Sequence, residues 1–337
     1  MEIRENVSLK PHNTFGIDVR ARRFTLLSTD QDIITFLNSH QKDQKSLLFL
    51  GGGSNILFTK DYEGTVAKIA TKGIFKVREN VDHVWIRAAA GEEWDSLVKY
   101  CVERGWGGLE NLSLIPGTVG AAPVQNIGAY GTELKDSLFM IDVFDRKTFC
   151  SIPLRPEQCH FGYRDSIFKQ SSGKQYVILS VTFRLSRKPT LKLDYGSIRE
   201  ELSFMSIHKP SITHMREAII RIRRRKLPDP ALVGNAGSFF RNPEVRKDIF
   251  EVLQKQHPSI SYFPAGDSIR IPAAWLIEQC GWKGFRQGYA GVHPDHPLVL
   301  VNYGTASGKE ILELVEKIRK SVFDRFGIFL VEEVNIV

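Results

Sequence analysis

Apolar positions recur at helical or strand-like spacing along most of the chain. Apolar residues three and four positions apart predict helices, and short apolar runs between turn residues predict strands. Before residue 227 this pattern predicts helices over 30–41, 94–101 and 211–226, strands over 46–50, 138–145 and 176–185, and further short strands between 64 and 90. The first helix follows a cap at Asp30, and together with the strand over 46–50 it makes the opening β-α-β in kind.

The composition changes after Leu227-Pro228-Asp229-Pro230, and this change predicts a domain boundary. Beyond it the spacing predicts a helix near 272–280, a strand near 297–302 and a long helix over 308–326. Ser307 and Glu310 have the spacing of a capping box at the start of the long helix. A final apolar strand is expected over 328–336.

Glycine and proline interrupt the pattern most strongly between residues 107 and 131. This stretch also carries many small apolar residues, which is unusual for a segment that only connects two elements. A loop of this length without secondary structure normally has a function.

Composition indicates an ordinary globular protein of 337 residues, with 42% hydrophobic and 25% charged residues. That length is enough for about two or three domains. The formal net charge of +8 suits an anionic ligand such as a nucleotide, a diphosphate or a carboxylate.

The chain shows no targeting or metal signal. It lacks the basic start and apolar run of a secretory signal, and it has no run of about 18 apolar residues that could span a membrane. The cysteines form no Cys-x-x-Cys pair and complete no zinc spacing with the histidines; they are Cys101, Cys150, Cys159 and Cys280. We therefore expect reduced, mostly buried thiols, no metal site and a cytoplasmic location.

A triple glycine follows the predicted strand over 46–50 directly, in Gly51-Gly52-Gly53-Ser54-Asn55. In such a turn the backbone N–H groups can face inward and bind phosphate oxygens. The spacing is neither the Rossmann fingerprint nor a P-loop. The segment is therefore either a phosphate-binding loop of another kind or a tight turn.

A second glycine-rich segment covers residues 114–131 and includes the amides Gln125 and Asn126. Small residues let a chain lie flat against a large planar ligand and bind it through backbone and side-chain hydrogen bonds. The alternative is a glycine-rich surface loop.

Ser238 stands between a glycine and two aromatic residues, in Gly237-Ser238-Phe239-Phe240. Glycine permits close approach of another molecule, and the phenylalanines can exclude water. The serine is either a turn hydroxyl bonded to its own backbone or a proton donor aimed into a dry pocket. No His-Asp pair forms a recognisable elbow around it, so a hydrolase nucleophile is not indicated.

Charged residues mark further candidate sites. Arg164 is either a surface ion-pair partner or a fixed cation for a carboxylate. The basic run at 221–226 is either a solvated helix face or a nucleic-acid contact, although it lacks interleaved aromatic residues. Lys226, beside Pro228, can point at a pyrophosphate. Glu332 and Glu333 are expected on opposite faces of the last strand, because side chains alternate along a strand.

Taken together, these segments resemble the UDP-N-acetylenolpyruvoylglucosamine reductase family (MurB), in its first type, which carries a tyrosine-bearing loop. The resemblance runs essentially from end to end, and the ordered set of motifs is specific although each motif alone is weak. The motifs are Asn13-Thr14-Phe15-Gly16, Gly51–Asn55, Gly108–Leu112, Ile115-Pro116-Gly117, Gln125–Gly131, Phe161–Ser166, Leu193-Asp194-Tyr195-Gly196, Lys226–Pro230 and Gly234–Phe240.

The resemblance implies an α+β fold. Its parts would be a bipartite FAD-binding unit of the PCMH type, like that of vanillyl-alcohol oxidase, and a smaller α+β substrate-binding domain. We expect FAD-binding subdomain 1 at residues 1–70, FAD-binding subdomain 2 at 71–226 and the substrate-binding domain at 227–337.

The resemblance also implies the reaction. NADPH, as co-substrate, reduces non-covalently bound FAD, whose N5 gives a hydride to C3 of the enolpyruvyl group of UDP-N-acetylglucosamine enolpyruvate. The product is UDP-N-acetylmuramate, in a cytoplasmic step of peptidoglycan synthesis. Ser238 would protonate C2, and Arg164 and Glu333 would stabilise the enolate-like state. Glu333 would act protonated or through a hydrogen bond, since a bare carboxylate repels an enolate.

Two places depart from the family pattern. Family members often have Pro-Glu-Val near the C-terminus, where this chain has Glu332-Glu333-Val334, and alignment on the valine selects Glu333. The first loop has Gly52 as its middle residue, where the family frequently has Gly-x-Gly-Ser-Asn.

The residues that the resemblance assigns to ligands fall into two groups. Those expected at FAD are Gly51, Gly52, Gly53, Ser54, Asn55, Ile115, Pro116, Gly117, Gln125, Asn126, Gly128 and Ala129. Those expected at the substrate are Tyr195, Lys226 and Asn242. A monomer without nucleic-acid or membrane partners is expected.

Two other functions stay open at the level of sequence. An FAD-dependent oxidase of the same superfold would share the glycine loops and lack the serine acid. A basic nucleic-acid-binding protein would instead use residues 221–226.

Overall fold

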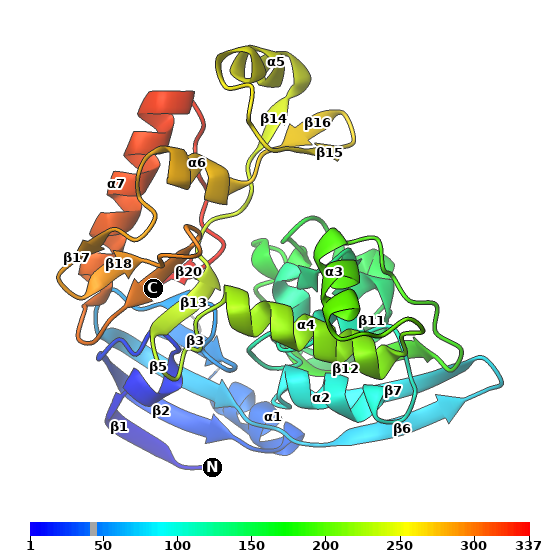
Figure 1. Ribbon diagram of the computed structural model, residues 1–337. Coiled ribbons are helices and arrows are strands. Elements are labelled where there is room, and N and C mark those ends of the chain that lie inside the picture. Colours follow the sequence, from blue (N-terminus) through cyan, green and yellow to red (C-terminus); the bar gives the residue numbers. More distant parts are fainter. Residues whose placement is uncertain (41–45) are drawn as a thin grey trace. The chain divides into compact units, whose positions relative to one another are not determined.

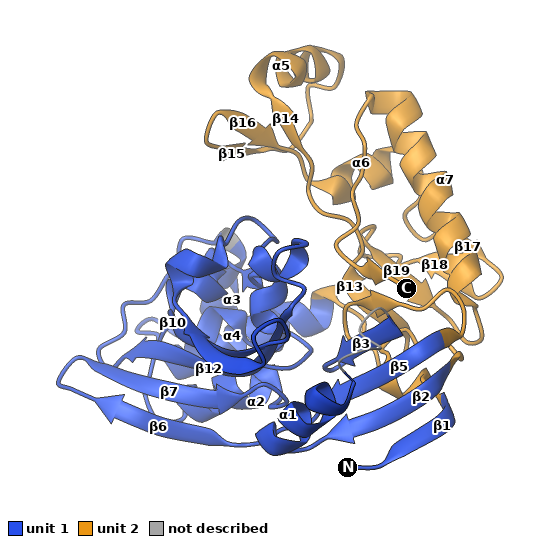
Figure 2. Ribbon diagram, turned by 180° about the vertical axis from the view of Figure 1, so that it is seen from behind, with its two compact units in different colours: residues 1–7, 21–52, 63–225 blue, residues 8–20, 53–62, 226–337 orange. Residues whose placement is uncertain are grey.

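The computed structural model describes residues 1–40 and 46–337, which form two compact units. Figure 2 colours unit 1 blue and unit 2 orange. Unit 1 comprises residues 1–7, 21–52 and 63–225, and unit 2 comprises residues 8–20, 53–62 and 226–337. The three-part domain division expected from the sequence stays a prediction, but one unit boundary lies next to residue 226, beside the expected one.

The first sheet follows the expected β-α-β opening. Its strand order is β1 (Ile3–Ser8), β2 (Arg20–Leu27), β5 (Tyr62–Ile69) and β3 (Leu47–Leu50), with β3 parallel to β5. Helix α1 (Asp30–Ser39) buries Ile33, Phe36 and Leu37. Its cap is Thr29, so the expected Asp30 cap is wrong: the Thr29 hydroxyl accepts from the Asp32 amide, while the Asp32 carboxylate accepts from the Thr29 amide. Residue 41, included in the predicted helix, lies outside the described residues.

The second sheet of unit 1 is antiparallel. Its order is β11 (Cys150–Leu154), β10 (Leu138–Asp145), β12 (Tyr176–Ser186), β7 (His83–Ala89) and β6 (Ile74–Glu79). Helices α2 (Trp94–Val102) and α4 (Ile212–Lys226) lie side by side on it, and α3 (Gly196–Phe204) lies beside α4 (Figure 1). The shared core includes Trp94, Leu97, Phe183, Leu185 and Ile212, all of them buried.

The segment from 107 to 131 is mostly irregular, as expected, with short turns η3 (Glu110–Leu112) and η4 (Ala122–Gln125) and the small strand β8 (Gly128–Ala129), which pairs with β9 (Thr132–Glu133). It is not a surface loop, because it buries Val119, Ala122, Pro123, Asn126 and Ile127. Its backbone is therefore held in one place by the core of unit 1.

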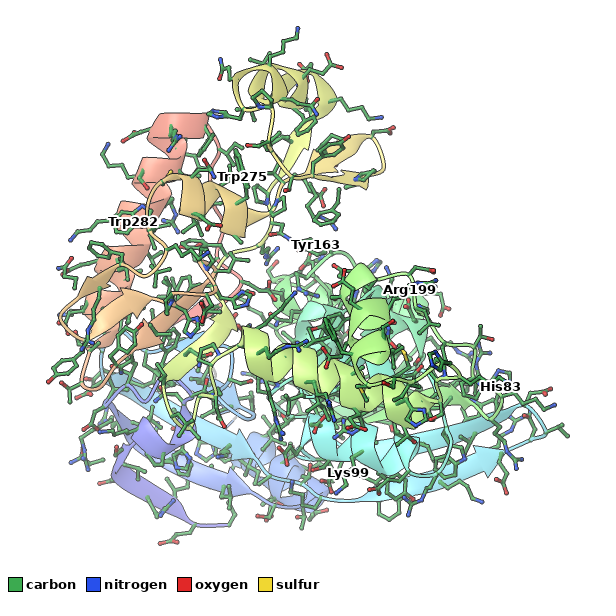
Figure 3. The ribbon with its side chains drawn as sticks, in the orientation of Figure 1. His83, Lys99, Tyr163, Arg199, Trp275 and Trp282 are labelled. Atoms are coloured by element: carbon green, nitrogen blue, oxygen red, sulfur yellow. The ribbon has the colours of Figure 1, made fainter. Side chains whose placement is uncertain are left out.

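Unit 2 is built on the sheet β13 (Gly234–Ser238), β19 (Val299–Asn302), β18 (Ala290–Val292) and β17 (Arg286–Gln287), with α6 (Ala273–Gln279) and α7 (Gly308–Phe326). Trp275 and Trp282, labelled in Figure 3, both contact α7. Trp275 packs on Phe326 with ring centroids 5.6 Å apart, and the Trp282 indole donates to the Ser321 hydroxyl at 2.6 Å. The predicted capping box at Ser307 and Glu310 is confirmed.

A small antiparallel sheet adds to unit 2, in the order β14 (Glu244–Arg246), β16 (Ser268–Arg270) and β15 (Phe263–Ala265), with α5 (Lys247–Gln256) beside it. The periodicity analysis missed these elements and also β1, β2, α3, β11, β13, β17 and β18. Most of them are too short for a periodic pattern to be recognised.

The expected C-terminal strand over 328–336 is wrong in extent. Only β20 (Asn335–Ile336) is a strand, and it pairs in parallel with β4 (Ile56–Leu57). Residues 331–333 instead run beside 239–241, with a single bridge between Phe240 and Glu332. Glu332 and Glu333 do not belong to one regular strand, so the expected alternation of side chains along a strand does not determine which of the two faces the site.

No helix among residues 1–40 and 46–337 combines the length and the apolar content needed to cross a membrane. The four cysteines are free thiols. Cys101 and Cys159 are buried, and that burial raises the pKa of each thiol to about 12; Cys280 is partly buried and Cys150 is exposed.

Candidate functional site

The first glycine loop needs its glycines because other backbone lies against it. A Cβ on Gly51 would lie 2.5 Å from the Thr118 hydroxyl oxygen, and a Cβ on Gly52 would lie 2.9 Å from the Gly117 Cα. Separations this short force a shift, and at Gly52 the obstacle is backbone. Thus, within unit 1, the fold brings together the two segments expected to bind FAD.

The other half of this loop belongs to unit 2 and holds the motif at residues 13–16. The Thr14 amide donates to the Gly53 carbonyl at 3.0 Å, and Gly53 has a left-handed φ of 67°. The Asn55 side chain donates to the Glu333 carbonyl at 3.1 Å, and the Asn335 amide donates to the Asn55 carbonyl at 3.1 Å. Asn55 therefore fixes the backbone that carries Glu333.

The second glycine-rich segment carries several unusual backbone conformations. Leu114, Asn126 and Tyr130 have positive φ values of 58°, 44° and 48°. Such conformations are costly for residues with a Cβ and tend to occur at functional sites. The Gly117 carbonyl accepts from the Trp94 amide at 3.0 Å, which ties the segment to the start of α2.

The Asn126 side chain forms its hydrogen bonds within the protein. Its amide group donates to the Glu133 carboxylate at 3.0 Å and to the Gly162 carbonyl at 3.1 Å, and its oxygen accepts from the Lys135 amide at 3.1 Å. Asn126 therefore shapes the segment, and what it offers to a cofactor is its backbone. Gly128 has a comparable part, since its carbonyl accepts from Arg164 at 2.7 Å.

Arg164 lies in a tight turn closed by Gly162 and Asp165, and its own φ is 54°. The turn is anchored by Ser166, which is buried and donates to the Val124 carbonyl at 2.6 Å. The Arg164 guanidinium is thereby held against Gly128, within the second glycine-rich segment. This placement favours the hypothesis that Arg164 is a fixed cation for a carboxylate over the hypothesis that it is a surface ion-pair partner.

Arg223 of α4 is a second cation in the same cluster, and the sequence analysis missed it. It donates to the Leu114 carbonyl at 3.3 Å, and the Tyr130 hydroxyl lies near enough to interact with its charge. Burial lowers the pKa of Arg223, with the nearby charge of Arg164 acting in the same direction. Two guanidiniums and a phenol this close together suit an anionic group with several oxygens, such as a carboxylate.

The position of Arg223 on its helix is the sequence feature that could have identified it as a site residue. Arg216 and Arg223 are seven residues apart and therefore share a face of α4. Arg216 uses that face to form a two-pronged ion pair with Asp95 of α2, at 2.6 and 2.7 Å. Other members of the basic run point elsewhere: Arg221 pairs with Glu217 at 2.7 Å, and Arg225 pairs with Glu201.

Tyr195 joins this cluster through aromatic contact. Its ring packs edge-on against Tyr130, with centroids 5.7 Å apart, and 48% of the residue is exposed. Burial raises the pKa of Tyr130, although Arg223 opposes the rise. Unit 1 thus groups the expected residues Arg164 and Tyr195 with Tyr130 and Arg223.

In unit 2, the Ser238 hydroxyl has no hydrogen-bond partner among residues 1–40 and 46–337. The turn before it is held by another group, because the Asn235 side chain accepts from the Gly237 amide at 2.9 Å. The reading of Ser238 as a turn hydroxyl is therefore not supported, and the hydroxyl stays available. Phe239 and Phe240, the next two residues in the chain, are fully buried and pack on each other, with ring centroids 5.3 Å apart.

The glutamates near the C-terminus have different surroundings. Glu332 forms an ion pair with Arg319 of α7. The Glu333 amide donates to the Phe239 carbonyl at 2.8 Å, so Glu333 lies beside the residue that follows Ser238. This position beside Phe239 supports Glu333, which alignment on the valine also selects, as the site residue.

The remaining expected substrate residues also lie in unit 2. The Asn242 oxygen accepts from the Ala273 amide at 2.9 Å, at the start of α6, which leaves the NH₂ group of Asn242 as a donor for a ligand. Lys226, the last residue of α4, is exposed. For Ser54, Ile115, Pro116, Gln125 and Ala129 the expected role at FAD stays a prediction.

Comparisons with known proteins support the motif resemblance. A family model for an FAD-binding domain matches residues 21–147, and a model for the C-terminal domain of UDP-N-acetylenolpyruvoylglucosamine reductase matches residues 229–337. The chain is similar to the UDP-N-acetylenolpyruvoylglucosamine reductases of Amoebophilus asiaticus and Pseudomonas syringae pv. tomato. It is 46% identical to each, over 100% of this chain and 100% and 99% of theirs.

A solved structure is similar over the same extent. The reductase of this name from Thermus caldophilus covers 99% of both chains with a TM-score of 0.69 at 24% sequence identity. At this identity the likeness concerns the fold.

Proposed function

The chain belongs to the UDP-N-acetylenolpyruvoylglucosamine reductase family, and on that premise we propose that it uses NADPH and FAD to reduce UDP-N-acetylglucosamine enolpyruvate to UDP-N-acetylmuramate. The resemblance inferred from the motifs is confirmed by the full-length identity of 46%. That identity is the observation that carries the activity, because it covers every segment in which a site residue is expected.

The residues present fit FAD. Gly51 and Gly52 leave no room for side chains against Gly117 and Thr118, which keeps a Cβ-free surface in the backbone, as a phosphate-binding loop requires. When bound, FAD supplies the hydride that reduces C3 of the enolpyruvyl group. The protein's part is to hold the cofactor through the two glycine-rich segments, the first of which is Gly51–Asn55.

We assign the substrate carboxylate to Arg164 and Arg223, with the Tyr130 hydroxyl beside them. Negative charge develops at C2 and spreads into this carboxylate as the hydride arrives. Cations that are already in place stabilise that charge without reorganising during the reaction. The turn at Gly162–Asp165 and the helix α4 supply this rigidity.

Ser238 is the proton donor to C2 in this proposal. Its hydroxyl is uncommitted within the described part of the chain, and the strand β13 fixes its position opposite Val299. A serine hydroxyl is a weak acid in water, but the developing carbanion is a strong base and a dry site keeps the transfer specific. Glu333 stabilises the same charge through a hydrogen bond.

We assign the binding of the nucleotide part of the substrate to Tyr195, Lys226 and Asn242. Lys226 offers a charge-assisted hydrogen bond to the diphosphate, and the Asn242 NH₂ group a neutral one. Arg221 and Arg225, two residues of the basic run, are already neutralised by ion pairs with Glu217 and Glu201. This pairing weighs against nucleic-acid binding by residues 221–226. The proposal also includes a cytoplasmic location and a monomeric state, in line with the sequence expectations.

The test is an anaerobic two-step experiment on the purified protein. The protein should show flavin absorbance that bleaches with NADPH and returns on addition of UDP-N-acetylglucosamine enolpyruvate, with UDP-N-acetylmuramate as product. An oxidase would give a different result, since its flavin would regain colour only when oxygen is admitted, with formation of peroxide. That outcome would overturn the proposal.

A further inference from the structure

The hairpin turn between β18 and β19 carries two histidines, His293 and His296. The His293 amide donates to the Val299 carbonyl, and the Val299 amide donates to the His296 carbonyl, each at 2.9 Å. The imidazole rings lie nearly parallel, with centroids 6.4 Å apart and an interplanar angle of 25°. The His293 ring is tied down, because its Nδ1 accepts from the Asp295 amide at 3.2 Å.

This turn lies at the same end of the sheet as Ser238. Val299 pairs with Ser238 across the sheet, and the Phe239 amide donates to the Leu298 carbonyl at 2.7 Å. His296 therefore precedes by three positions the residue opposite the proposed proton donor. The sequence analysis gave this histidine no role.

The charged groups around His296 come from three segments of unit 2. Lys226 at the end of α4, His293 in the same turn and Lys283 after α6 face it as cations or potential cations, and Asp295 faces it as an anion. Lys283 is already paired with Glu278 at 2.8 Å. Among residues 1–40 and 46–337, neither the His296 ring nor the Lys226 amine has a hydrogen-bond or ion-pair partner.

The protonation of His296 follows from these surroundings. Burial lowers the pKa of His296, with Lys226 and His293 next in effect, while Asp295 opposes them. The imidazole of the free protein is therefore mostly neutral near neutral pH. A bound dianion would reverse the local field and favour the imidazolium.

We propose that His296 is a second binding residue, beside Lys226, for the diphosphate of the nucleotide substrate, and that it takes up a proton when that diphosphate binds. The inference rests on the proposed function, which places the diphosphate at Lys226. The exposed Lys226 amine and the partly buried His296 ring have no hydrogen-bond or ion-pair partner among residues 1–40 and 46–337, and Asp295 is the one anion that faces His296. A diphosphate supplies two negative charges that both side chains can bind through charge-assisted hydrogen bonds.

Proton uptake can be measured directly on the unaltered holoenzyme. UDP-N-acetylglucosamine is the probe, because its diphosphate keeps both charges from about pH 5.5 to 8 and its binding needs no chemistry. Calorimetric titration in buffers of different ionisation enthalpy should report net uptake of a fraction of one proton. The affinity should rise as the pH falls, by about tenfold for each unit by which binding raises the pKa of His296.

Variants then assign the proton to this residue. His296→Gln keeps a hydrogen-bond donor but cannot titrate, so it should abolish the proton uptake and flatten the pH dependence of affinity. His296→Lys keeps a permanent charge, so it should bind tightly at pH about 8 without uptake. His208→Gln, an exposed histidine of unit 1, is the matched control and should behave as wild type.

A dinucleotide also contains a diphosphate, and the two half-reactions distinguish the source. If the substrate diphosphate is the partner, His296→Gln should alter the dependence of flavin re-oxidation on substrate concentration and leave flavin reduction by NADPH unchanged. A change confined to NADPH would overturn the assignment to the substrate. Absence of proton uptake in wild type would refute the inference, even if the Gln variant did not fold, whereas continued formation of UDP-N-acetylmuramate would leave the proposed function intact.

Discussion

Single side chains of the same type are used very differently in this protein. Arg221 and Arg225 form ion pairs on the surface of α4, whereas Arg223, between them in sequence, lies beside Tyr130 and Leu114. Glu332 and Glu333 also differ in their surroundings: the Glu332 carboxylate pairs with Arg319 of α7, whereas the Glu333 amide donates to the Phe239 carbonyl. At this scale, the surroundings that the fold gives a side chain, rather than its residue type, decide how it is used.

Ser238→Ala should separate the two half-reactions. Reduction of the flavin by NADPH should continue at a near-normal rate, while re-oxidation by the enolpyruvyl substrate should slow by about 10²–10⁴-fold, the usual contribution of a positioned general acid. Ser238→Cys should retain part of the activity, because a thiol also gives up a proton. Stopped-flow absorbance of the flavin measures both steps, and equal slowing of the two would argue against an acid role.

Arg223→Gln should weaken the hold on the substrate carboxylate. Hydrogen bonds to charged groups contribute about 1.5–3 kcal/mol, so re-oxidation of the reduced flavin should slow by about 10- to 150-fold, with little change in its reduction by NADPH. Arg224→Gln is the matched control, because Arg224 is the exposed neighbour on the same helix. Similar kinetics in the two variants would remove Arg223 from the site.

Among the elements, the glycine-rich segments owe their shape to close packing of one backbone on another. Gly52 approaches Gly117 so closely that no side chain fits, and Gly53 leaves no room for a Cβ beside the His12 carbonyl. The second segment is fixed at its start by Asp95, which accepts from the Leu114 amide at 2.5 Å. Both segments are therefore set before any ligand binds.

Gly52→Ala should impair cofactor binding. The added Cβ would lie 2.9 Å from the Gly117 Cα, so one segment must move away from the other. We expect the purified variant to contain much less flavin than wild type, measured by absorbance per protein. Gly266→Ala is the control: Gly266 has a positive φ of 61° and nothing within 4 Å of its added Cβ, so this variant should lose stability without losing flavin.

Asp95→Asn should destabilise unit 1 at neutral pH. Burial alone would raise the pKa of Asp95, but the hydrogen bonds from Arg216 and the Leu114 amide, with the charges of Arg216 and Arg223, outweigh burial and lower it. Removing one partner of a largely buried ion pair costs about 3–5 kcal/mol, measurable by denaturant unfolding.

The sign of the pH dependence follows from the lowered pKa of Asp95. The stability that this carboxylate contributes is complete above its unfolded-state pKa, about 3.9, and is lost as the pH falls through the lower folded-state value. The difference between wild type and Asp95→Asn should therefore be constant from about pH 5 to 8 and shrink only in stronger acid. A difference that already disappears near pH 6 would show that another group is responsible.

For the molecule as a whole, FAD binding without a covalent link is expected. Burial raises the pKa of the Cys101 and Cys159 thiols to about 12, which makes both poor nucleophiles for flavin attachment. Acid precipitation should leave free FAD in the supernatant. Flavin retained in the pellet would contradict this. Bound FAD should also raise the unfolding free energy, by about 2.7 kcal/mol at a free concentration 100 times its dissociation constant.

The sequence alone determined the elements with strong periodicity and the identity of the motifs. Helices α2, α4 and α7 and strands β3, β10 and β12 lie within a few residues of their predicted bounds, because each buries a continuous apolar face that repeats at its own period. Ordered glycine, proline and aromatic motifs identified the family, since their backbone requirements are local.

Tertiary structure decided what each motif touches. The contact of Gly52 with Gly117, the pairing of Glu332 with Arg319 and the inward position of Arg223 join residues far apart in the chain, and no local pattern encodes such contacts. The C-terminal apolar run is a further case, because its pattern predicts one continuous strand. In the structure, residues 331–333 pair with 239–241, and only Asn335–Ile336 forms a strand, which pairs with β4. The partner available in the fold, rather than the apolar pattern, set its conformation, because a strand exists only where another strand can satisfy its hydrogen bonds.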